Sequence, residues 1–231
     1  MLIIDAINAQ ANPDQAKILQ RFFKTGKGQY GEWDQFLWIK VPVQRKIAKQ
    51  YIQTPFAELE ILLDSPIHEY RLIALLILIQ KSLKADEKTK QIIYTFYLKH
   101  TKSVNNRDLV DLSAPTIVGN YLIERDKKIL YTLAKSKNLR EKRIAIISTF
   151  AFLRVGLFDD TFQIAEMLMK DEHDLIHKAV GRMLREVGKR SLYEEEKFLK
   201  KHYKHMPRTM LRYAIEKFEE GKRQKYLKWS I

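Results

Sequence analysis

The sequence predicts an all-α protein, a right-handed solenoid of HEAT-like helix pairs with a basic concave face. Period-2 strand patterns are nearly absent from the chain. Only 8 Gly and 6 Pro are present, and they fall where helices would begin or break. Five apolar segments with helical spacing can be laid over one another at intervals of about 32–40 residues, which is the spacing of two-helix repeats.

The individual helices follow from apolar periodicity and from the prolines that precede it. Pro42, Pro55, Pro66 and Pro207 each stand before an apolar pattern with helical spacing, as expected of a first helical turn. Segment 24–39 contains three glycines and is expected to be a long irregular loop. Helices are expected at about 10–24, 42–52, 55–63, 66–83, 87–100, 105–123, 126–136, 138–155, 159–170, 172–189, 192–205 and 207–220.

The chain of 231 residues is 45% hydrophobic, which suffices for a full core. We therefore expect a single HEAT-like repeat domain over residues 1–231, since tetratricopeptide and ankyrin signatures are not visible. N-terminal helices and the glycine-containing loop 24–39 would precede the repeats. The repeat pairs are expected at about 55–83, 87–123, 126–155, 159–189 and 192–220.

The charge balance points to a polyanionic partner. Lys and Arg number 42 against 28 Asp and Glu, which gives a formal net charge of +14 and a pI near 9.7. A charge of this size attracts nucleic acid, so duplex DNA is the partner we consider first. The alternative is a lysine-rich surface with no such partner.

Other compartments and site types are disfavoured by the sequence. The chain has no cysteine, which excludes disulfides, thiolate metal sites and cysteine nucleophiles, and favours a reducing bacterial cytoplasm or nucleoid. The start, MLIIDAINAQ, lacks a basic segment, and the longest apolar run, 72–79, is too short for a membrane helix. The histidine pairs His173 with His177 and His202 with His205 lack a further ligand, so we expect no metal site. We also expect no cofactor, no membrane contact and a monomer.

The overlaid segments share a position that would line the inner surface of the solenoid. This position holds Arg71, Asp111, Arg143, Lys178 and Arg212. Basic side chains there would bind duplex phosphates, in a strong but sequence-tolerant way. Further cations extend this surface or belong to an ordinary solvated face. They are Lys197, Lys200, Lys201, Lys204 and Arg208.

Asp111 is the acidic member of this row, within the stretch SVNNRDLVDLSAP. Asn105 or Asn106 can cap a helix there, and Asp108 and Asp111 lie one turn apart near its start. Two interpretations remain open. The carboxylates complement the helix dipole, or Asp111 serves chemistry by stabilising an oxocarbenium-like sugar, or orienting water, while an alkylated purine leaves.

Several segments match blocks of a known family in order and spacing. They are RFFKTGKGQYGEWDQFLWI, SPIHEYRLIALLIL, NNRDLVDLSAPTIVGNYL, REKRIAIISTF, DDTFQIAEMLMKDEHDLIHKAVGRMLREVGKR and PRTMLRYAIEKF. From about residue 20 to 227 the chain therefore resembles the DNA alkylation repair family, whose HEAT-like repeat DNA glycosylases include the AlkD branch.

This resemblance implies a basic solenoid that holds duplex DNA and excises positively charged N3- or N7-alkylated purines as a monofunctional N-glycosylase. It also implies that the reaction needs no conventional pocket for a flipped base. The family's cleft combines an aspartate, an arginine and tryptophans that contact the deoxyribose of the lesion. By motif, the aspartate falls on Asp111 and the arginine on Arg143.

The tryptophan positions are where the chain departs from the family. Relatives usually read NNWDLVD and GWMLRE, whereas NNRDLVD and GRMLRE place Arg107 and Arg182 at the aromatic positions, and Arg140 stands where a tryptophan is common. Arginine can stack and pair with phosphate, so we assign all three to DNA binding, although a cation beside an oxocarbenium is repulsive. Trp33 and Trp38 replace usual glycines, where they rebuild an aromatic contact or pack the loop.

Three hypotheses follow. In the first, the protein is a glycosylase with Asp111 as the anion and Arg143 as a contact to DNA and cleft. In the second, it is a non-catalytic DNA-binding paralogue that recognises damaged or branched DNA. In the third, it is a helical scaffold for an acidic protein, which the salt dependence of DNA binding would separate from the others.

Overall fold

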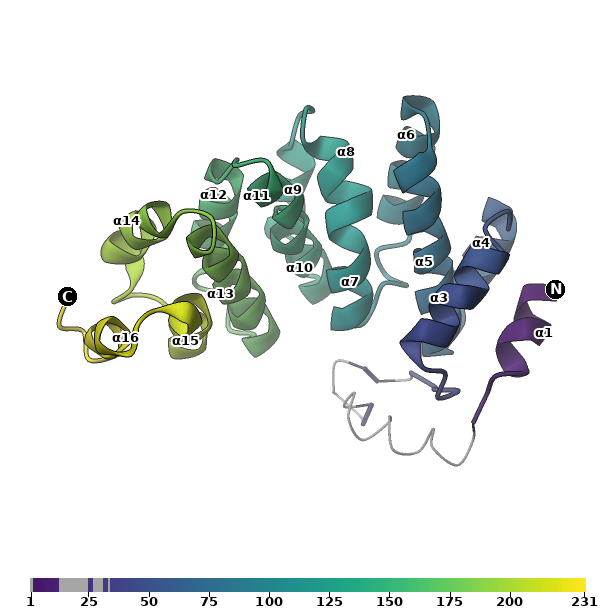
Figure 1. Ribbon diagram of the computed structural model, residues 1–231, viewed down its shortest axis with the longest axis horizontal. Helices are drawn as coiled ribbons and strands as arrows, with labels where there is room; N and C mark the ends of the chain where they lie inside the picture. The colour runs from purple at the N-terminus through teal and green to yellow at the C-terminus, as the bar shows by residue number, and fades with distance from the viewer. Residues whose placement is uncertain (1, 13–24, 27–30, 33) are drawn as a thin grey trace. The chain divides into compact units, whose positions relative to one another are not determined.

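The computed structural model describes residues 2–12, 25–26, 31–32 and 34–231, and over these residues the secondary structure is helical, with one isolated bridge between Gln35 and Ile67. The chain divides into two compact units, Met1–Ile117 and Val118–Ile231. In each unit the helices follow one another as neighbouring pairs (Figure 1). The prediction of an all-α fold is confirmed.

The first unit is built around helix α5 (His68–Lys84). Its segment 72–78 is buried at every residue, because apolar side chains occupy all faces of this stretch. Helices α3, α4, α6 and α7 each pack against α5. The remaining helices of this unit are α1 (Leu2–Asn8), α3 (Val41–Gln50), α4 (Phe56–Leu63), α6 (Glu87–Lys99) and α7 (Arg107–Ala114).

In the second unit, helices α10, α13 and α15 pack in succession, and α9, α12 and α14 pair with them. This is the arrangement expected when one helix of each repeat forms a continuous layer. The bounds are α8 (Asn120–Leu122), α9 (Lys128–Ala134), α10 (Leu139–Ser148), α11 (Phe150–Arg154), α12 (Asp159–Leu168), α13 (Asp174–Gly188), α14 (Leu192–His202), α15 (Arg208–Ala214), the 3-10 turn η2 (Ile215–Lys217) and α16 (Glu220–Leu227).

Local side-chain chemistry sets several helix ends. Asp86, Asn138 and Ser191 each accept a hydrogen bond from a backbone N–H of the first turn that follows. We expected one helix over 105–123, but α7 gives way to a π-helical turn, η1 (Pro115–Gly119). Proline has no N–H to donate to the helix ladder, so the break at Pro115 has a direct cause.

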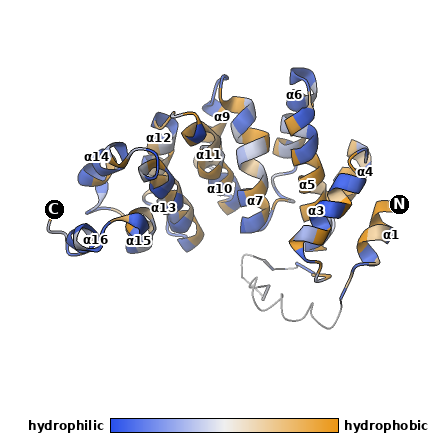
Figure 2. Ribbon diagram, viewed as in Figure 1, coloured by the Kyte–Doolittle hydropathy of each residue, from blue (hydrophilic) through white to orange (hydrophobic). Residues whose placement is uncertain are grey.

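The ends of the chain differ from expectation. The helix expected at 10–24 lies almost wholly outside the described residues. Helix α1 was not anticipated, and it contributes Ile3 and Ile7 to the core. Helix α16 was not anticipated either, because it is almost entirely hydrophilic (Figure 2). It is held by Tyr226, whose ring meets Tyr203 and Phe218 edge-on at centroid distances of 5.3 and 5.6 Å.

Two glycines let helices of the second unit approach through their main chains. A Cβ built on Gly119 would lie 2.3 Å from the carbonyl oxygen of Ser148, and one on Gly181 would lie 2.4 Å from that of Met210. No side chain fits at such distances, so both positions require glycine for close packing.

Within the described residues, no helix is long and apolar enough to cross a membrane.

Candidate functional site

A buried group of charged and amide side chains ties the start of α7 to α5 and to the loop before α3. We call it the Asp34 cluster. Arg71 Nη2 and Asn105 Nδ2 each donate to Asp34 Oδ1 at 2.7 Å, and Asn106 Nδ2 donates to Oδ2 at 3.1 Å. His68 Nδ1 lies 3.6 Å from Asp34 Oδ2. Asp34 is only 3% exposed, so these partners replace the water that its carboxylate has lost.

The cluster extends to α7 through His68, whose Nε2 lies 2.8 Å from Asp108 Oδ2. Burial opposes the charged imidazole, but the hydrogen bonds with Asp108 and Asp34 outweigh it and raise the pKa of His68 to about 9. Burial likewise opposes ionisation of Asp34, yet the bond with His68 and the charge of Arg71 lower its pKa to about 2. At neutral pH, therefore, two cations enclose the Asp34 carboxylate.

Helix α7 carries Asp111 one turn beyond Asp108. Asn106 is the N-cap, since its side chain accepts from the backbone N–H of Arg107 at 2.8 Å. Both Arg107 and Asp111 are partly exposed. Because residues three apart on a helix are neighbours, anchoring Asp108 through His68 also fixes the turn that presents Asp111.

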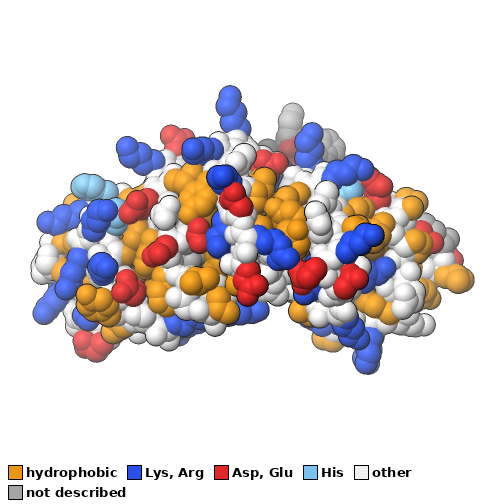
Figure 3. All heavy atoms as spheres, turned by 90° about the horizontal axis from the view of Figure 1, so that it is seen from above, with side chains coloured by type: hydrophobic (Ala, Val, Ile, Leu, Met, Phe, Trp, Pro, Cys, Tyr) orange, Lys and Arg blue, Asp and Glu red, His pale blue; other side chains and the backbone are white. Residues whose placement is uncertain are grey.

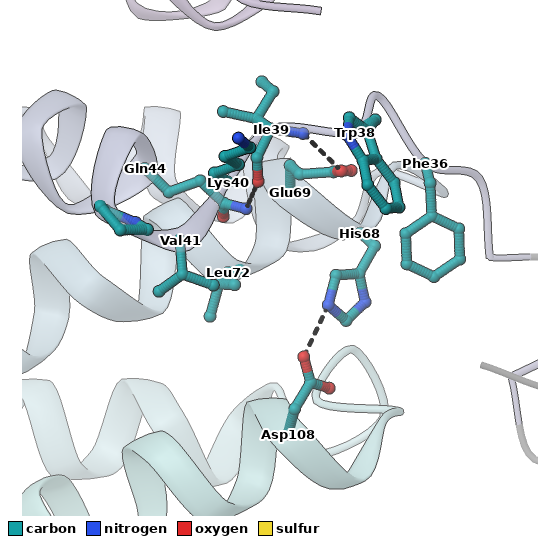
Figure 4. Close-up of a pocket in the computed structure, with 11 residues that line it drawn as sticks. Phe36, Trp38, Ile39, Lys40, Val41, Gln44, His68, Glu69, Leu72 and Asp108 are labelled. Atoms are coloured by element: carbon teal, nitrogen blue, oxygen red, sulfur yellow. Dashed lines mark hydrogen bonds and ion pairs between the residues drawn. The ribbon is translucent and has the colours of Figure 1, made fainter. Parts of the chain in front are cut away.

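A cavity of about 370 Å³ lies beside His68 and Asp108. Figure 4 shows Phe36 and Trp38 on one side of it and Val41 on the other, with the pair His68–Asp108 below. The Phe36 ring stacks on the imidazole of His68 at 4.9 Å between centroids. Trp38 lies in the loop before α3 with a backbone φ of 58°, a conformation in which L-residues are rare. Trp33 lies outside the described residues.

Two arginines of the expected cationic row, Arg71 and Arg143, are buried. Arg71 is 5% exposed and paired with Asp34, and Arg143 is 6% exposed with Nη1 donating to the carbonyl of Leu175 at 2.6 Å. Each sits in the first turns of its helix, where a nearby acceptor draws the guanidinium inward. Neither guanidinium is presented to an external phosphate in this conformation.

The other cations of the row keep some exposure. Arg212 on α15 is exposed, and Lys178 on α13 is partly exposed and forms an ion pair with Asp174 at 2.5 Å. Arg140 on α10 and Arg182 on α13 are also partly exposed. In the second unit these three helices pack side by side, as the overlay of the repeats predicts.

The additional lysines at 197, 200, 201 and 204 are exposed, and so is Arg208. Lys201 approaches Glu166 at 3.7 Å, and Arg208 donates to the carbonyl of Leu227 at 2.7 Å. On the face in Figure 3, basic side chains lie among acidic and apolar ones, which is a pattern typical of a solvated surface.

Three histidines of the two pairs, His173, His177 and His202, make local contacts. His173 caps α13 by accepting from Leu175 N at 3.1 Å, and His177 contacts the carbonyl of Asp171. His202 Nε2 lies 3.0 Å from Glu166. Among the residues that the structure describes, no group of three side chains is arranged to hold a metal ion.

Sequence reasoning missed Asp34 and His68. Neither belongs to the repeat overlay, and they are 34 positions apart, so no spacing in the sequence joins them. Asp108 was noted only as an acidic residue of a first helical turn. A weak signal existed in the glycine-containing loop, where a lone aspartate stands between two large aromatic residues in WDQF.

The helix pairs of the two units define an all-helical protein built from stacked helices. A family model described as "DNA alkylation repair enzyme" matches residues 3–218, and the chain belongs to this family. A solved structure described as "Predicted DNA alkylation repair enzyme from Enterococcus faecalis" is similar with a TM-score of 0.73 at 16% identity, over 91% of this chain and 98% of that one. That likeness shows the fold. No curated protein matches the chain.

Proposed function

We propose that this member of the DNA alkylation repair family binds duplex DNA and is a monofunctional N-glycosylase for positively charged N3- or N7-alkylated purines. The observation that carries the proposal is the placement of Asp111. It is a partly exposed carboxylate on a helix whose start is fixed by the buried Asp34 cluster, within a family match that covers residues 3–218.

The chemistry that we propose requires little more than a fixed anion. An alkylated purine is already a cationic leaving group, so the bond to the sugar breaks without prior protonation. The sugar then gains oxocarbenium character, which the Asp111 carboxylate stabilises directly or by orienting the attacking water. Preorganisation matters because a carboxylate that must reorient loses much of its electrostatic effect.

Arg143 has a different part in this proposal from the one that its motif position implies. Its guanidinium is buried and bonded to the carbonyl of Leu175 in the first turn of α13. It therefore acts as a positioning residue for the helix that carries Lys178 and Arg182. Those two side chains, with Arg212 and Arg140, are the DNA contacts that we propose.

The test is incubation with duplex DNA that contains 7-methylguanine or 3-methyladenine, followed by measurement of the free base. We expect release by the wild type and a loss of at least about ten-fold in Asp111→Asn, since removing one electrostatic group commonly costs 10²–10³ in rate. Asp126→Asn is the matched control, because Asp126 is an exposed aspartate outside α7. Equal release by Asp111→Asn and the wild type would refute the role of Asp111.

A second function, that of a non-catalytic DNA-binding protein for damaged or branched DNA, is favoured by one observation. Arg107 follows the N-cap of the helix that carries Asp111, so a cation stands on the anion's own helix where the family resemblance expects a tryptophan. This cation weakens the field offered to an oxocarbenium. Tight, salt-sensitive binding without base release would establish this second function. Release that increases in Arg107→Trp would instead establish the glycosylase.

A further inference from the structure

The cavity beside α7 has the dimensions and lining of a small-molecule site. Its volume of about 370 Å³ falls within the range of roughly 300–1,000 Å³ found for ligand pockets. Its walls are mainly apolar and aromatic, from Phe36, Trp38, Val41 and Leu72, and a few polar groups face it (Figure 4). Flat walls of this kind favour a flat ligand, because aromatic side chains stack on the faces of heterocyclic rings.

Trp38 is held in this wall at a conformational cost. Its φ of 58° lies in the left-handed region, where a bulky side chain is strained by about 1–3 kcal/mol. The adjacent loop residues are anchored: the amides of Leu37 and Ile39 donate to the carboxylate of Glu69 at 3.0 and 3.3 Å. The loop therefore keeps the indole at the cavity although the backbone would prefer glycine there.

Three polar atoms on lining residues have no hydrogen-bond partner among the described residues. They are the indole Nε1 of Trp38, which is a donor, and two acceptors, Oε1 of Gln44 and Oδ1 of Asp108. Buried polar groups are nearly always satisfied, so each such atom calls for an explanation. A ligand that offers both acceptors and donors on one flat ring, with small shifts of these side chains, would supply the missing partners.

We propose that this cavity binds a purine base. A purine has ring nitrogens that accept hydrogen bonds and exocyclic amino groups that donate them, and its two fused rings fill a stacking slot better than a pyrimidine. This inference rests on the proposed function for its biological meaning, since it gives the released or extruded base a place beside Asp108, which lies one helical turn from Asp111 on α7.

The test is isothermal titration calorimetry of the full chain with adenine, 3-methyladenine and cytosine. We expect purine binding that is weakened at least about five-fold in Trp38→Gly, because stacking on one aromatic ring is worth about 1–3 kcal/mol. Glycine suits the backbone at this position, so the variant should fold. Trp229→Gly is the matched control: Trp229 has a φ of 57° and is 52% exposed, and its loss should leave purine binding unchanged.

A duplex carrying 2-aminopurine separates a base in a strand from a free base, because this analogue fluoresces strongly when it is unstacked. A fluorescence rise that Trp38→Gly removes assigns the cavity to an extruded base. Purine binding without this rise assigns it to the free base. Wild-type protein that binds no purine up to the solubility limit, or binding that Trp38→Gly leaves unchanged, overturns the proposal.

These outcomes are distinct from the fate of the glycosylase proposal. Asp111→Asn should lower base release at least about ten-fold and leave the binding of free purine intact. Purine binding without any base release from alkylated DNA would therefore preserve the site and refute the enzyme. Normal base release by Trp38→Gly, together with no purine binding by the wild type, would refute the purine site and preserve the glycosylase.

Discussion

Asp34→Asn should destabilise the protein far more than an ordinary aspartate substitution. The change keeps the shape of the side chain and removes its charge. Arg71 and His68 would then remain buried as cations without their shared counter-ion, and the amide would turn an N–H toward groups that donate. Because asparagine keeps a single acceptor oxygen, either Asn105 or Asn106 would lose the acceptor that holds it at the start of α7.

The magnitude follows from the environment of the carboxylate. Breaking a buried ion pair by removing one partner typically costs about 3–5 kcal/mol. The pKa of Asp34 is lowered from 3.8 to about 2, so ionisation of this carboxyl alone contributes about 2 kcal/mol to the free energy of unfolding at pH 7. We therefore expect the free energy of unfolding to fall by about 3–5 kcal/mol at pH 7.

The assay is urea denaturation followed by circular dichroism, with hydrogen exchange at the amides of α7 as a local measure. Asp126→Asn serves as the control, since its carboxylate is exposed and paired with Lys128 at 3.2 Å, and it should leave the midpoint unchanged. Faster exchange in α7 should accompany the loss in Asp34→Asn. If both variants unfold at the same urea concentration, the Asp34 cluster does not stabilise the fold as argued here.

Three further predictions concern pH and packing. The folded-state pKa of His68 is raised from 6.5 to about 9, so the stabilisation that its charged form provides is present below pH 6.5 and is lost as the pH rises through 9. In His68→Gln, the fall in unfolding free energy over this pH range should be smaller by about 3 kcal/mol. Urea titrations across the range measure it. Burial and the charge of Glu196 raise the pKa of Glu195 to about 9, so the folded protein suppresses ionisation of this carboxyl. Glu195→Gln should therefore stabilise the protein by about 3 kcal/mol at pH 7 but not at pH 4.5. An equal stabilisation at both pH values would contradict the raised pKa. Gly119→Ala should lower the melting temperature, because the added methyl group overpacks the contact with Ser148 at a cost of about 1–3 kcal/mol. Gly221→Ala on α16 should not, because only the flexible Glu219 side chain is near. Equal melting temperatures of the two variants would show that the contact with Ser148 can relax.

Much of the fold could be predicted because helical periodicity is a local signal. The apolar run at 72–79 and the proline positions located α3, α4 and α5 to within a few residues. At Pro115 the apolar periodicity of the sequence continues, but proline has no N–H to donate, and the α-helix gives way to a π-helical turn. Helix α16 could not be predicted from periodicity, since it is held mainly by one buried tyrosine.

The candidate site was only partly predictable, because the fate of a charged side chain depends on partners that are distant in the sequence. The overlay selected Arg71 and Arg143 as equivalent positions, and each lies in the first turns of its helix. It could not indicate that Asp34 and the carbonyl of Leu175 would capture their guanidinium groups. Trp38 was singled out because the family resemblance expects glycine there, and its backbone φ of 58° is a conformation that favours glycine.

The glycines at 119 and 181 have a consequence for how the repeat array can vary. At each, the neighbouring segment contributes a carbonyl oxygen at one position and a Cβ three positions later, from Ser148 of α10 and Ala151 of α11 in one case and from Met210 and Tyr213 of α15 in the other. The step from helix to helix is thus set by main-chain thickness, which no side-chain substitution elsewhere can tune. The distance between α13 and α15, and with it the distance between the cations that they carry, is therefore fixed by this contact. That distance would persist while the surface residues themselves change.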